Sequence, residues 1–342
     1  MELPPRAPQR IVSLLPAATE IVAALGLRDR LVGRSHECDE PDGIDRLPSL
    51  TAARIDGSAP SREIHEQVGR ALAVGPTGCG QPAAGCRTPS AASAPAASHS
   101  GSSALFALDV DTLAGLQPDL ILTQAACDVC AIAAADVEAA ARAAGVGTRV
   151  LSLSPATLGD LLADILAVGA ATGTLPRARE LAARLQARID SVACRTKALT
   201  RGNAARPPRV AMIEWLDPPM AAGNWVPEMV RLAGAEDVLG RAGAHSHWIT
   251  WDDVAAADPD TVVLVPCGFP LDRVVAEAAG PEVRPHLQGL RAFPAGRVIA
   301  VDGNRLFNRP GPRLVDSLEL LAEILHPGAF RFGHSVNASV CR

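Results

Sequence analysis

The stretch RIVSLLPAATEIVAALGLRDRLVG (residues 10–33) decides the fold, because its pattern returns in the second half of the chain. It begins with a short β-branched apolar run, continues with apolar residues at helical spacing, and reaches Gly26 where a helix would end. The later stretch RVAMIEWLDPPMAAGNWVPEMVRLAGAEDVLG (residues 209–240) again reads strand, loop, helix and glycine. Two copies of one α/β unit predict two similar lobes.

Two further pairs of segments match between the halves. DVDTLAGLQPDLILTQAAC (109–127) and WDDVAAADPDTVVLVPCGF (251–269) each place Pro-Asp directly before a buried strand, and TRVLSLSP (148–155) corresponds to GRVIAVDGN (296–304). Strands that alternate with helices are typical of a parallel sheet covered by helices. We therefore predict an α/β fold made of two Rossmann-like lobes.

One long, rigid helix is predicted to join these lobes. The sequence from Arg177 places Leu181, Leu185, Ile189 and Val192 on one stripe, with arginines elsewhere. About 23 residues would form a strut of roughly 35 Å. The predicted division is a tail (1–9), an N-terminal lobe (10–175), the bridging helix (176–200), a C-terminal lobe (208–327) and a second tail (328–342).

Residues 75–103 interrupt the first lobe with a low-complexity run of Ser, Ala, Pro and Gly. Such a composition has little to bury, so we expect a disordered insertion on the surface. We interpret Cys79, Cys86 and His99 within it as incidental rather than as metal ligands.

Composition excludes several classes of function. A net charge of −5 and a pI near 5.9, with scattered charges, argue against nucleic-acid binding. No stretch approaches the roughly 20 apolar residues that a membrane-spanning helix needs, so no membrane insertion is expected. Pro16 and Glu20 interrupt the apolar run near the start, so we predict no signal peptide. A cytoplasmic location is the expectation, with an extracytoplasmic one if the true start lies elsewhere.

The chain resembles the substrate-binding proteins of iron-siderophore, haem and cobalamin ABC transporters, and more narrowly their cobalamin-binding branch. The resemblance covers about residues 9–327 apart from the insertion, and rests on the order of several motifs. These are residues 10–41, LAGLQPDLILTQAACDVC (113–130), NWVPEMVRLAGAEDVLG (224–240), WDDVAAADPDTVVL (251–264) and RPGPRLVDSLELLAEILHP (309–327).

This resemblance implies a monomer that binds cobalamin or another corrinoid without catalysis, in a cleft between the lobes, for uptake through an ABC permease or for handling inside the cell. Tryptophan suits such a site because it offers a large, flat contact to a corrin face. Acidic residues that would dock to the permease are Glu138 and Glu277. The ligand-binding candidates are Pro16, Ala17, His36, Glu37, Cys38, Gln124, Cys127, Cys130, Trp215, Asn224, Trp225, His247, Trp248, Trp251, Phe269, Asn304, Phe307 and Arg309.

Other functions remain open at this point. His36 is a candidate axial ligand for cobalt, although a polar pocket residue is the simpler interpretation. Haem or a ferric siderophore is an alternative ligand. Cys127 and Cys130 could instead serve a thiol or zinc enzyme, although two cysteines alone are weak support for zinc. A dinucleotide-binding enzyme is disfavoured because no G-x-G-x-x-G follows a predicted strand.

Overall fold

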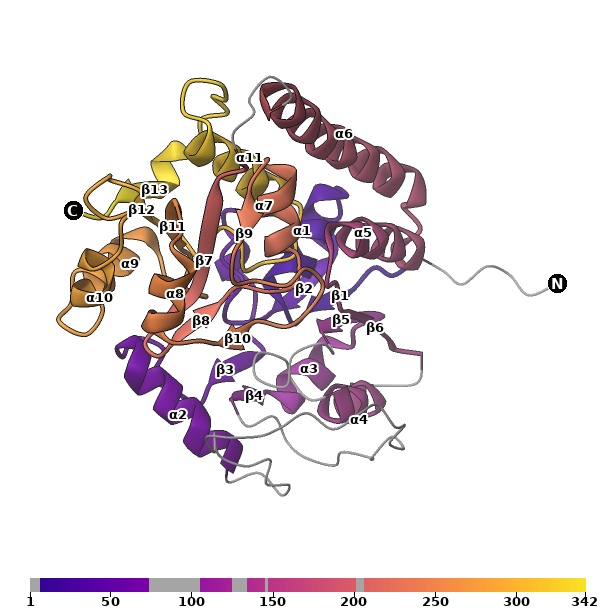
Figure 1. Ribbon diagram of the computed structural model, residues 1–342. Coiled ribbons are helices and arrows are strands. Elements are labelled where there is room, and N and C mark those ends of the chain that lie inside the picture. Colours follow the sequence, from indigo (N-terminus) through magenta and orange to yellow (C-terminus); the bar gives the residue numbers. More distant parts are fainter. Residues whose placement is uncertain (1–6, 74–104, 125–133, 145–146, 201–205) are drawn as a thin grey trace, which may run out of the picture.

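Two α/β lobes joined by one long helix make up the protein (Figure 1). This computed structural model describes residues 7–73, 105–124, 134–144, 147–200 and 206–342. The predicted insertion at 75–103 lies outside the described residues. The predicted α/β fold is confirmed.

The N-terminal lobe is built on a parallel four-stranded sheet of order β2-β1-β5-β6. Ile11 pairs with Leu120 in its centre, and both side chains are buried. A two-stranded antiparallel sheet, β3-β4, lies beside it. The elements are β1 (Ile11–Ser13), α1 (Pro16–Ala24), β2 (Leu31–Arg34), β3 (Thr51–Ala53), α2 (Ser61–Ala73), β4 (Phe106–Leu108), α3 (Val110–Leu116), β5 (Leu120–Gln124), α4 (Ala134–Ala144), β6 (Arg149–Leu153) and α5 (Leu158–Thr172).

The C-terminal lobe has a seven-stranded sheet of order β10-β8-β7-β11-β12-β13, with β9 paired to β7. Its central strands β7, β11 and β12 run parallel, and β8, β10 and β13 add antiparallel edges. The elements are β7 (Arg209–Leu216), β8 (Pro219–Ala221), α7 (Val226–Leu232), β9 (Glu236–Asp237), β10 (His247–Trp248), α8 (Trp251–Ala257), β11 (Thr261–Leu264), α9 (Leu271–Ala278), α10 (Arg284–Gln288), β12 (Val298–Val301), α11 (Leu314–Leu325) and β13 (Ala338–Val340).

The repeated Pro-Asp motif has the same role in both lobes. Asp119 accepts hydrogen bonds from the backbone N–H groups of Gln9 and Arg10 at 2.7 and 2.9 Å, directly before β1. Asp260 accepts the N–H of Arg209 at 2.9 Å, at the start of β7. Each aspartate thus fastens the start of its own strand to the neighbouring parallel strand.

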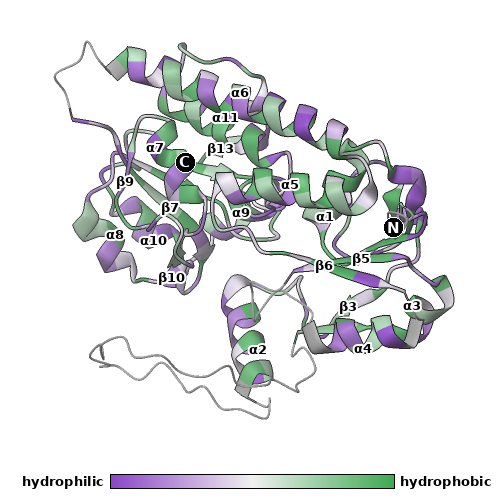
Figure 2. Cartoon of the chain, turned by 90° about the vertical axis from the view of Figure 1, so that its right-hand side faces the viewer, coloured by the Kyte–Doolittle hydropathy of each residue, from purple (hydrophilic) through white to green (hydrophobic). Residues whose placement is uncertain are grey.

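The bridging helix is α6 (Leu175–Thr200), one residue longer at its start than predicted. Its predicted stripe of Leu181, Leu185, Ile189 and Val192 is buried, and packs in one continuous core with residues of both lobes. Figure 2 shows α6 covering α11, whose side chains are largely apolar and buried.

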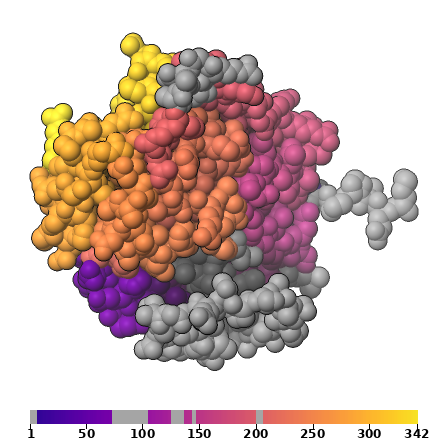
Figure 3. Space-filling model, in the orientation of Figure 1, coloured from indigo at the N-terminus to yellow at the C-terminus, as the bar shows by residue number. Residues whose placement is uncertain are grey.

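Helix α2 belongs to the first lobe by sequence but packs on the second. Ala59 and Ile64 lie in the same apolar cluster as Ala211, Val254 and Val274 of the C-terminal lobe. Figure 3 shows α2, in purple, directly against the orange surface of that lobe. We call residues 55–68 the strap, because they cross from one lobe to the other.

The C-terminal segment is part of the fold rather than a loose tail. Strand β13 pairs with β12, and Phe330 is buried against the guanidinium of Arg195, 4.3 Å from its ring centre. Within the described residues, no helix is long and apolar enough to cross a membrane.

Candidate ligand site between the lobes

Loops that leave the carboxyl ends of the parallel strands meet where the two lobes face each other. Residues 35–41 follow β2, Gln124 ends β5, and residues 303–309 follow β12. A Cβ atom at Gly303 would lie 2.1 Å from the carbonyl oxygen of Pro266, so glycine alone lets the loops after β11 and β12 press together. In open α/β sheets this edge is where ligands bind. We call this region the inter-lobe site.

Arg309 and Asp39 join the lobes in this site. The Nη1 and Nη2 atoms of Arg309 donate to the two carboxylate oxygens of Asp39, and Nη2 also donates to Asn304 Oδ1 at 2.7 Å. Asn304 Nδ2 donates to Asp39 Oδ2 at 3.1 Å. Burial opposes ionisation of Asp39, but the hydrogen bonds and charge of Arg309 outweigh it and hold the pKa of that carboxyl below its ordinary value.

A second group of ion pairs lies beside the first. Arg313 donates from Nη2 and Nε to the carboxylate of Glu20 at 2.6 and 3.0 Å. Burial raises the pKa of Glu20 although Arg313 opposes the shift. Glu40 accepts from Arg305 at 2.8 Å and from Arg313 at 3.5 Å. Helix α1 and the loop at 35–41 are therefore fastened to the loop before α11.

The strap makes its own polar contacts with the C-terminal lobe. Arg62 pairs with both oxygens of Asp217, and Ser61 donates its N–H and hydroxyl to the carboxylate of Glu277 at 3.0 and 2.6 Å. Trp215 Nε1 donates to the carbonyl oxygen of Ser61 at 3.2 Å, and Arg273 donates to the carbonyl oxygen of Gly57 at 2.6 Å. The position of α2 is thus fixed by the C-terminal lobe.

Trp248 is an exposed member of the predicted ligand contacts. Its side chain is 53% exposed, which is unusual for tryptophan. Its ring contacts His65 of α2 edge to face, with ring centres 4.6 Å apart. The imidazole of His65 makes no hydrogen bond to any described residue. An indole of one lobe and an imidazole of the other therefore present a joint surface.

His36 is held in a defined orientation. Its Nδ1 lies 2.6 Å from Thr51 Oγ1, and its ring packs 5.3 Å from that of Phe106. Burial, together with the charge of Arg34, lowers the pKa of His36, so the ring is neutral near pH 7. Among the described residues nothing bonds to its Nε2.

Several predicted contacts lie beneath the surface of the site instead of facing it. Cys38 is 2% exposed, its Sγ is 3.0 Å from Thr19 Oγ1, and burial raises the pKa of its thiol to about 11. Trp225 Nε1 donates to the carbonyl oxygen of Phe307 at 2.7 Å. The buried members of the predicted set are Ala17, Cys38, Trp225, Trp251, Phe269 and Phe307.

The other predicted residues retain exposed surface in part or in full. Pro16 begins α1, and Asn224 lies before α7 with a left-handed φ of 50°. His247 lies in β10 beside Trp248. The partly or fully exposed members are Pro16, His36, Glu37, Gln124, Trp215, Asn224, His247, Trp248, Asn304 and Arg309. Cys127 and Cys130 lie outside the described residues.

The two predicted docking residues have different surroundings. Glu138 of α4 is exposed and lies 3.8 Å from Arg142 on the same helix. Glu277 is mostly buried by its contacts with the strap.

Sequence reasoning missed His65, Arg62, Asp217 and Asp39. The pairing of Asp39 with Arg309 joins residues 270 positions apart, and no local sequence pattern predicts such a contact. The acidic residues around Asp39 and the arginines between 305 and 313 are the only features of the sequence that we identify as pointing to this ion pair.

One group of side chains, Asp316, Glu319 and His334, has metal-like spacing. The guanidinium of Arg188 donates to both carboxylates at 2.6 Å, and His334 Nε2 lies 2.9 Å from Glu319. A guanidinium fills the position that a cation would need, so we interpret the group as an ion-pair network joining α6 to α11.

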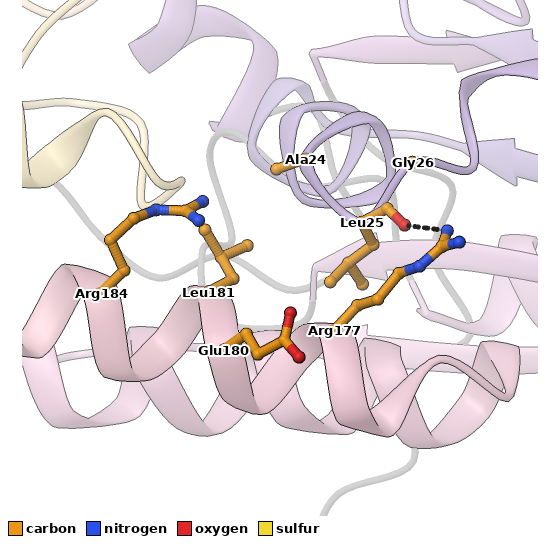
Figure 4. A pocket seen from close by; sticks show the side chains of 7 residues that line it. All are labelled: Ala24, Leu25, Gly26, Arg177, Glu180, Leu181 and Arg184. Atoms are coloured by element: carbon orange, nitrogen blue, oxygen red, sulfur yellow. Dashed lines mark hydrogen bonds between the residues drawn. The ribbon is translucent and has the colours of Figure 1, made fainter.

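A pocket of about 300 Å³ lies between the end of α1 and α6 (Figure 4). Arg177 donates there to the carbonyl oxygen of Leu25 at 3.2 Å, and Arg184 and Glu180 line the rim. Because its lining includes none of the strand-end loops that the structure describes, we do not assign the ligand to this pocket.

Comparison with known proteins agrees with the arrangement of the lobes. The model of the periplasmic binding protein family matches residues 86–304. The ABC transporter substrate-binding lipoprotein YvrC of Bacillus subtilis is 23% identical over 331 residues, or 95% of this chain and 82% of the relative. A lipoprotein relative does not support the cytoplasmic location expected from the sequence.

Solved structures share the fold. A periplasmic haem-binding protein from Pseudomonas aeruginosa superposes with a TM-score of 0.68 at 20% identity, covering 98% of each chain. The periplasmic vitamin B12-binding protein BtuF of Vibrio cholerae gives a TM-score of 0.61 at 18% identity, covering 93% of this chain and 97% of that one. The haem-binding protein RhuT of Roseiflexus gives 0.62 at 21% identity, covering 94% and 99%.

Proposed function

Because the chain belongs to the periplasmic binding protein family, we propose that it binds a corrinoid such as cobalamin between its lobes, without catalysis, for an ABC permease. The observation that carries this proposal is the half-exposed indole of Trp248, which packs edge to face against His65 of the strap. A corrin macrocycle has a broad apolar face, which an exposed indole suits.

The rim of the inter-lobe site supports the same ligand. Gln124, Asn304 and His247 offer side chains that can form hydrogen bonds, and all three retain partly exposed surface. The amide side chains around a corrin can both donate and accept hydrogen bonds, so carboxamides and imidazoles can pair with them. His36 is a candidate cobalt ligand because Thr51 holds its Nδ1 and no described residue bonds to its Nε2.

Haem is the second candidate ligand, because two of the structural relatives are haem-binding proteins. A ferric siderophore is a third. We propose that the chain meets an ABC permease on the outer side of the membrane, since a relative is an ABC transporter substrate-binding lipoprotein. Glu138 is the better proposed docking residue on grounds of exposure, since Glu277 is engaged by Ser61.

The test is a titration of the full chain with cyanocobalamin, hemin and a ferric siderophore, followed by tryptophan fluorescence and by the absorbance of each ligand. We expect saturable quenching by micromolar cyanocobalamin. Absence of any change with cyanocobalamin, together with saturation by hemin, would replace the corrinoid by haem. Absence of binding by all three would overturn the proposal.

A further inference from the structure

The charge of the inter-lobe site is decided by how its arginines are paired. Arg309, the predicted ligand contact, donates to Asp39 through two nitrogens, to Asn304 at 2.7 Å and to the carbonyl oxygen of Glu37 at 3.3 Å. A guanidinium that shares both terminal nitrogens with a carboxylate has little positive potential left for a third group.

Of the two partners, the carboxylate is the more accessible. The side chain of Asp39 is 45% exposed, and that of Arg309 is 12% exposed. A ligand that approaches the pair from solvent therefore meets the acid before the base. The depressed pKa of Asp39 means that this acid is ionised at neutral pH.

The neighbouring cations are balanced in the same way. Arg305 pairs with Glu40, and Arg313 pairs with Glu20 and Glu40. Arg34 donates to the carbonyl oxygens of Ser35, His36 and Cys38 from behind the loop at 35–41. Each of these guanidinium groups thus already has oxygen partners within the protein.

We infer that Asp39 is a specificity-determining residue, which neutralises Arg309 and makes the inter-lobe site select against macrocycles that carry carboxylates at their rim. This deepens the proposed function, and rests on it for the placement of the ligand between the lobes. A macrocycle rimmed by amides meets no repulsion here, whereas one that carries carboxylates or phenolates must approach an ionised acid. Rejection by a like charge is a stronger filter than a shortage of attractive contacts.

The experiment compares hemin, which carries two carboxylates, with cyanocobalamin, which carries no carboxylate and has no net charge. Asp39→Asn keeps the size and one acceptor oxygen of the side chain but removes its charge. We expect this variant to bind hemin about tenfold more tightly than the unmodified chain, and to change cyanocobalamin affinity by less than about threefold. Asp190→Asn, on the exposed side of α6 beside Gln186, makes the same change in net charge as a control and should alter neither affinity.

A double variant tests whether Arg309 is the cause of the gain in hemin affinity. Asp39→Asn with Arg309→Gln should lose the gained hemin affinity, because the released guanidinium is what attracts the carboxylates. Thermal melts of all variants confirm that each is folded. Equal hemin affinity in the unmodified chain and in Asp39→Asn would overturn the inference, as would a gain that survives Arg309→Gln.

These outcomes are separable from failure of the proposed function. If the unmodified chain binds no cyanocobalamin but Asp39→Asn still gains hemin affinity through Arg309, the corrinoid proposal fails and the role of Asp39 stands. If cyanocobalamin binds and hemin affinity ignores Asp39, the corrinoid proposal stands and the role of Asp39 fails.

Discussion

Arg62 of the strap and Asp217 at the end of β7 form a bidentate ion pair between the lobes, with Nε–Oδ2 and Nη2–Oδ1 distances of 2.8 and 2.7 Å. The side chain of Asp217 is only 12% exposed, whereas that of Arg62 is 58% exposed. Because the geometry is bidentate and the carboxylate is mostly buried, we expect this pair to contribute more to stability than a solvent-exposed ion pair and less than a buried one.

Asp217→Asn should therefore destabilise the protein by about 1–2 kcal/mol, more than a surface pair and less than a fully buried one. Urea unfolding measures the change. Glu66→Gln, which removes an exposed pair with Arg70 on the same helix, is the matched control and should change stability by less than about 0.5 kcal/mol. Equal effects of the two substitutions would show that the pair does not hold the strap.

Trp248→Ala should weaken ligand binding without weakening the fold. Loss of a large aromatic contact predicts an affinity about 10–100-fold lower, measured by the cyanocobalamin titration. Trp251→Ala is the contrasting variant, because Trp251 is buried and stacks on His286, and it should destabilise the protein by about 3–5 kcal/mol. An unchanged affinity in Trp248→Ala would show that the indole does not contact the ligand.

Glu20→Gln should be strongly destabilising, because it leaves the charge of the partly buried Arg313 with only the longer ion pair to Glu40. We expect a loss of about 2–4 kcal/mol in the free energy of unfolding. Replacing both partners, as Glu20→Met with Arg313→Met, should recover most of this loss because no unpaired charge remains. A double variant less stable than Glu20→Gln would argue against this account.

The carboxyl group of Asp237 should make the protein less stable as the pH rises, whereas a carboxyl group whose pKa is lowered by folding has the opposite effect. Burial raises the pKa of its carboxyl to about 6, and its Oδ2 has no hydrogen-bond partner among the described residues. Since an unfolded aspartate has a pKa near 3.9, the native state holds a proton that the unfolded chain releases. This contribution to stability is full below about pH 4 and is lost as pH rises towards about 6.

Asp237→Asn keeps an acceptor for the N–H groups of Leu239 and Gly240. It should be more stable than the unmodified chain by about 1–3 kcal/mol at pH 7.5, and by little near pH 4. Urea unfolding at the two pH values measures the difference. Asp253→Asn should show the opposite sign, because hydrogen bonds from Thr250 lower the pKa of Asp253. A gain in Asp237→Asn that is equal at both pH values would contradict this origin.

The sequence predicted those parts of the fold that depend on local pattern. The stripe from Leu181 to Val192 identified the bridging helix, and the two Pro-Asp motifs identified equivalent strands, because periodicity and turn chemistry act over a few residues. The strap was not predicted to cross between the lobes, because the apolar face of α2 does not reveal which lobe buries it.

The sequence predicted which loops form the candidate site better than it predicted which of their side chains face outward. Placement at the carboxyl ends of strands follows from fold class, and it holds for His36 after β2 and for Asn304 and Arg309 after β12. Whether a loop residue faces outward depends on packing from other elements. Cys38 illustrates this, since contact with Thr19 of α1 buries its thiol.

The strap also bears on the order in which the molecule acquires its structure. Arg62 meets a partner 155 positions later, and Ser61 one 216 positions later. A chain emerging from the ribosome therefore completes its first lobe while Ala59 and Ile64 still lack the apolar surface that they finally cover. Contacts of such long range slow folding, and we expect the strap to reach its final position only after the C-terminal lobe has formed.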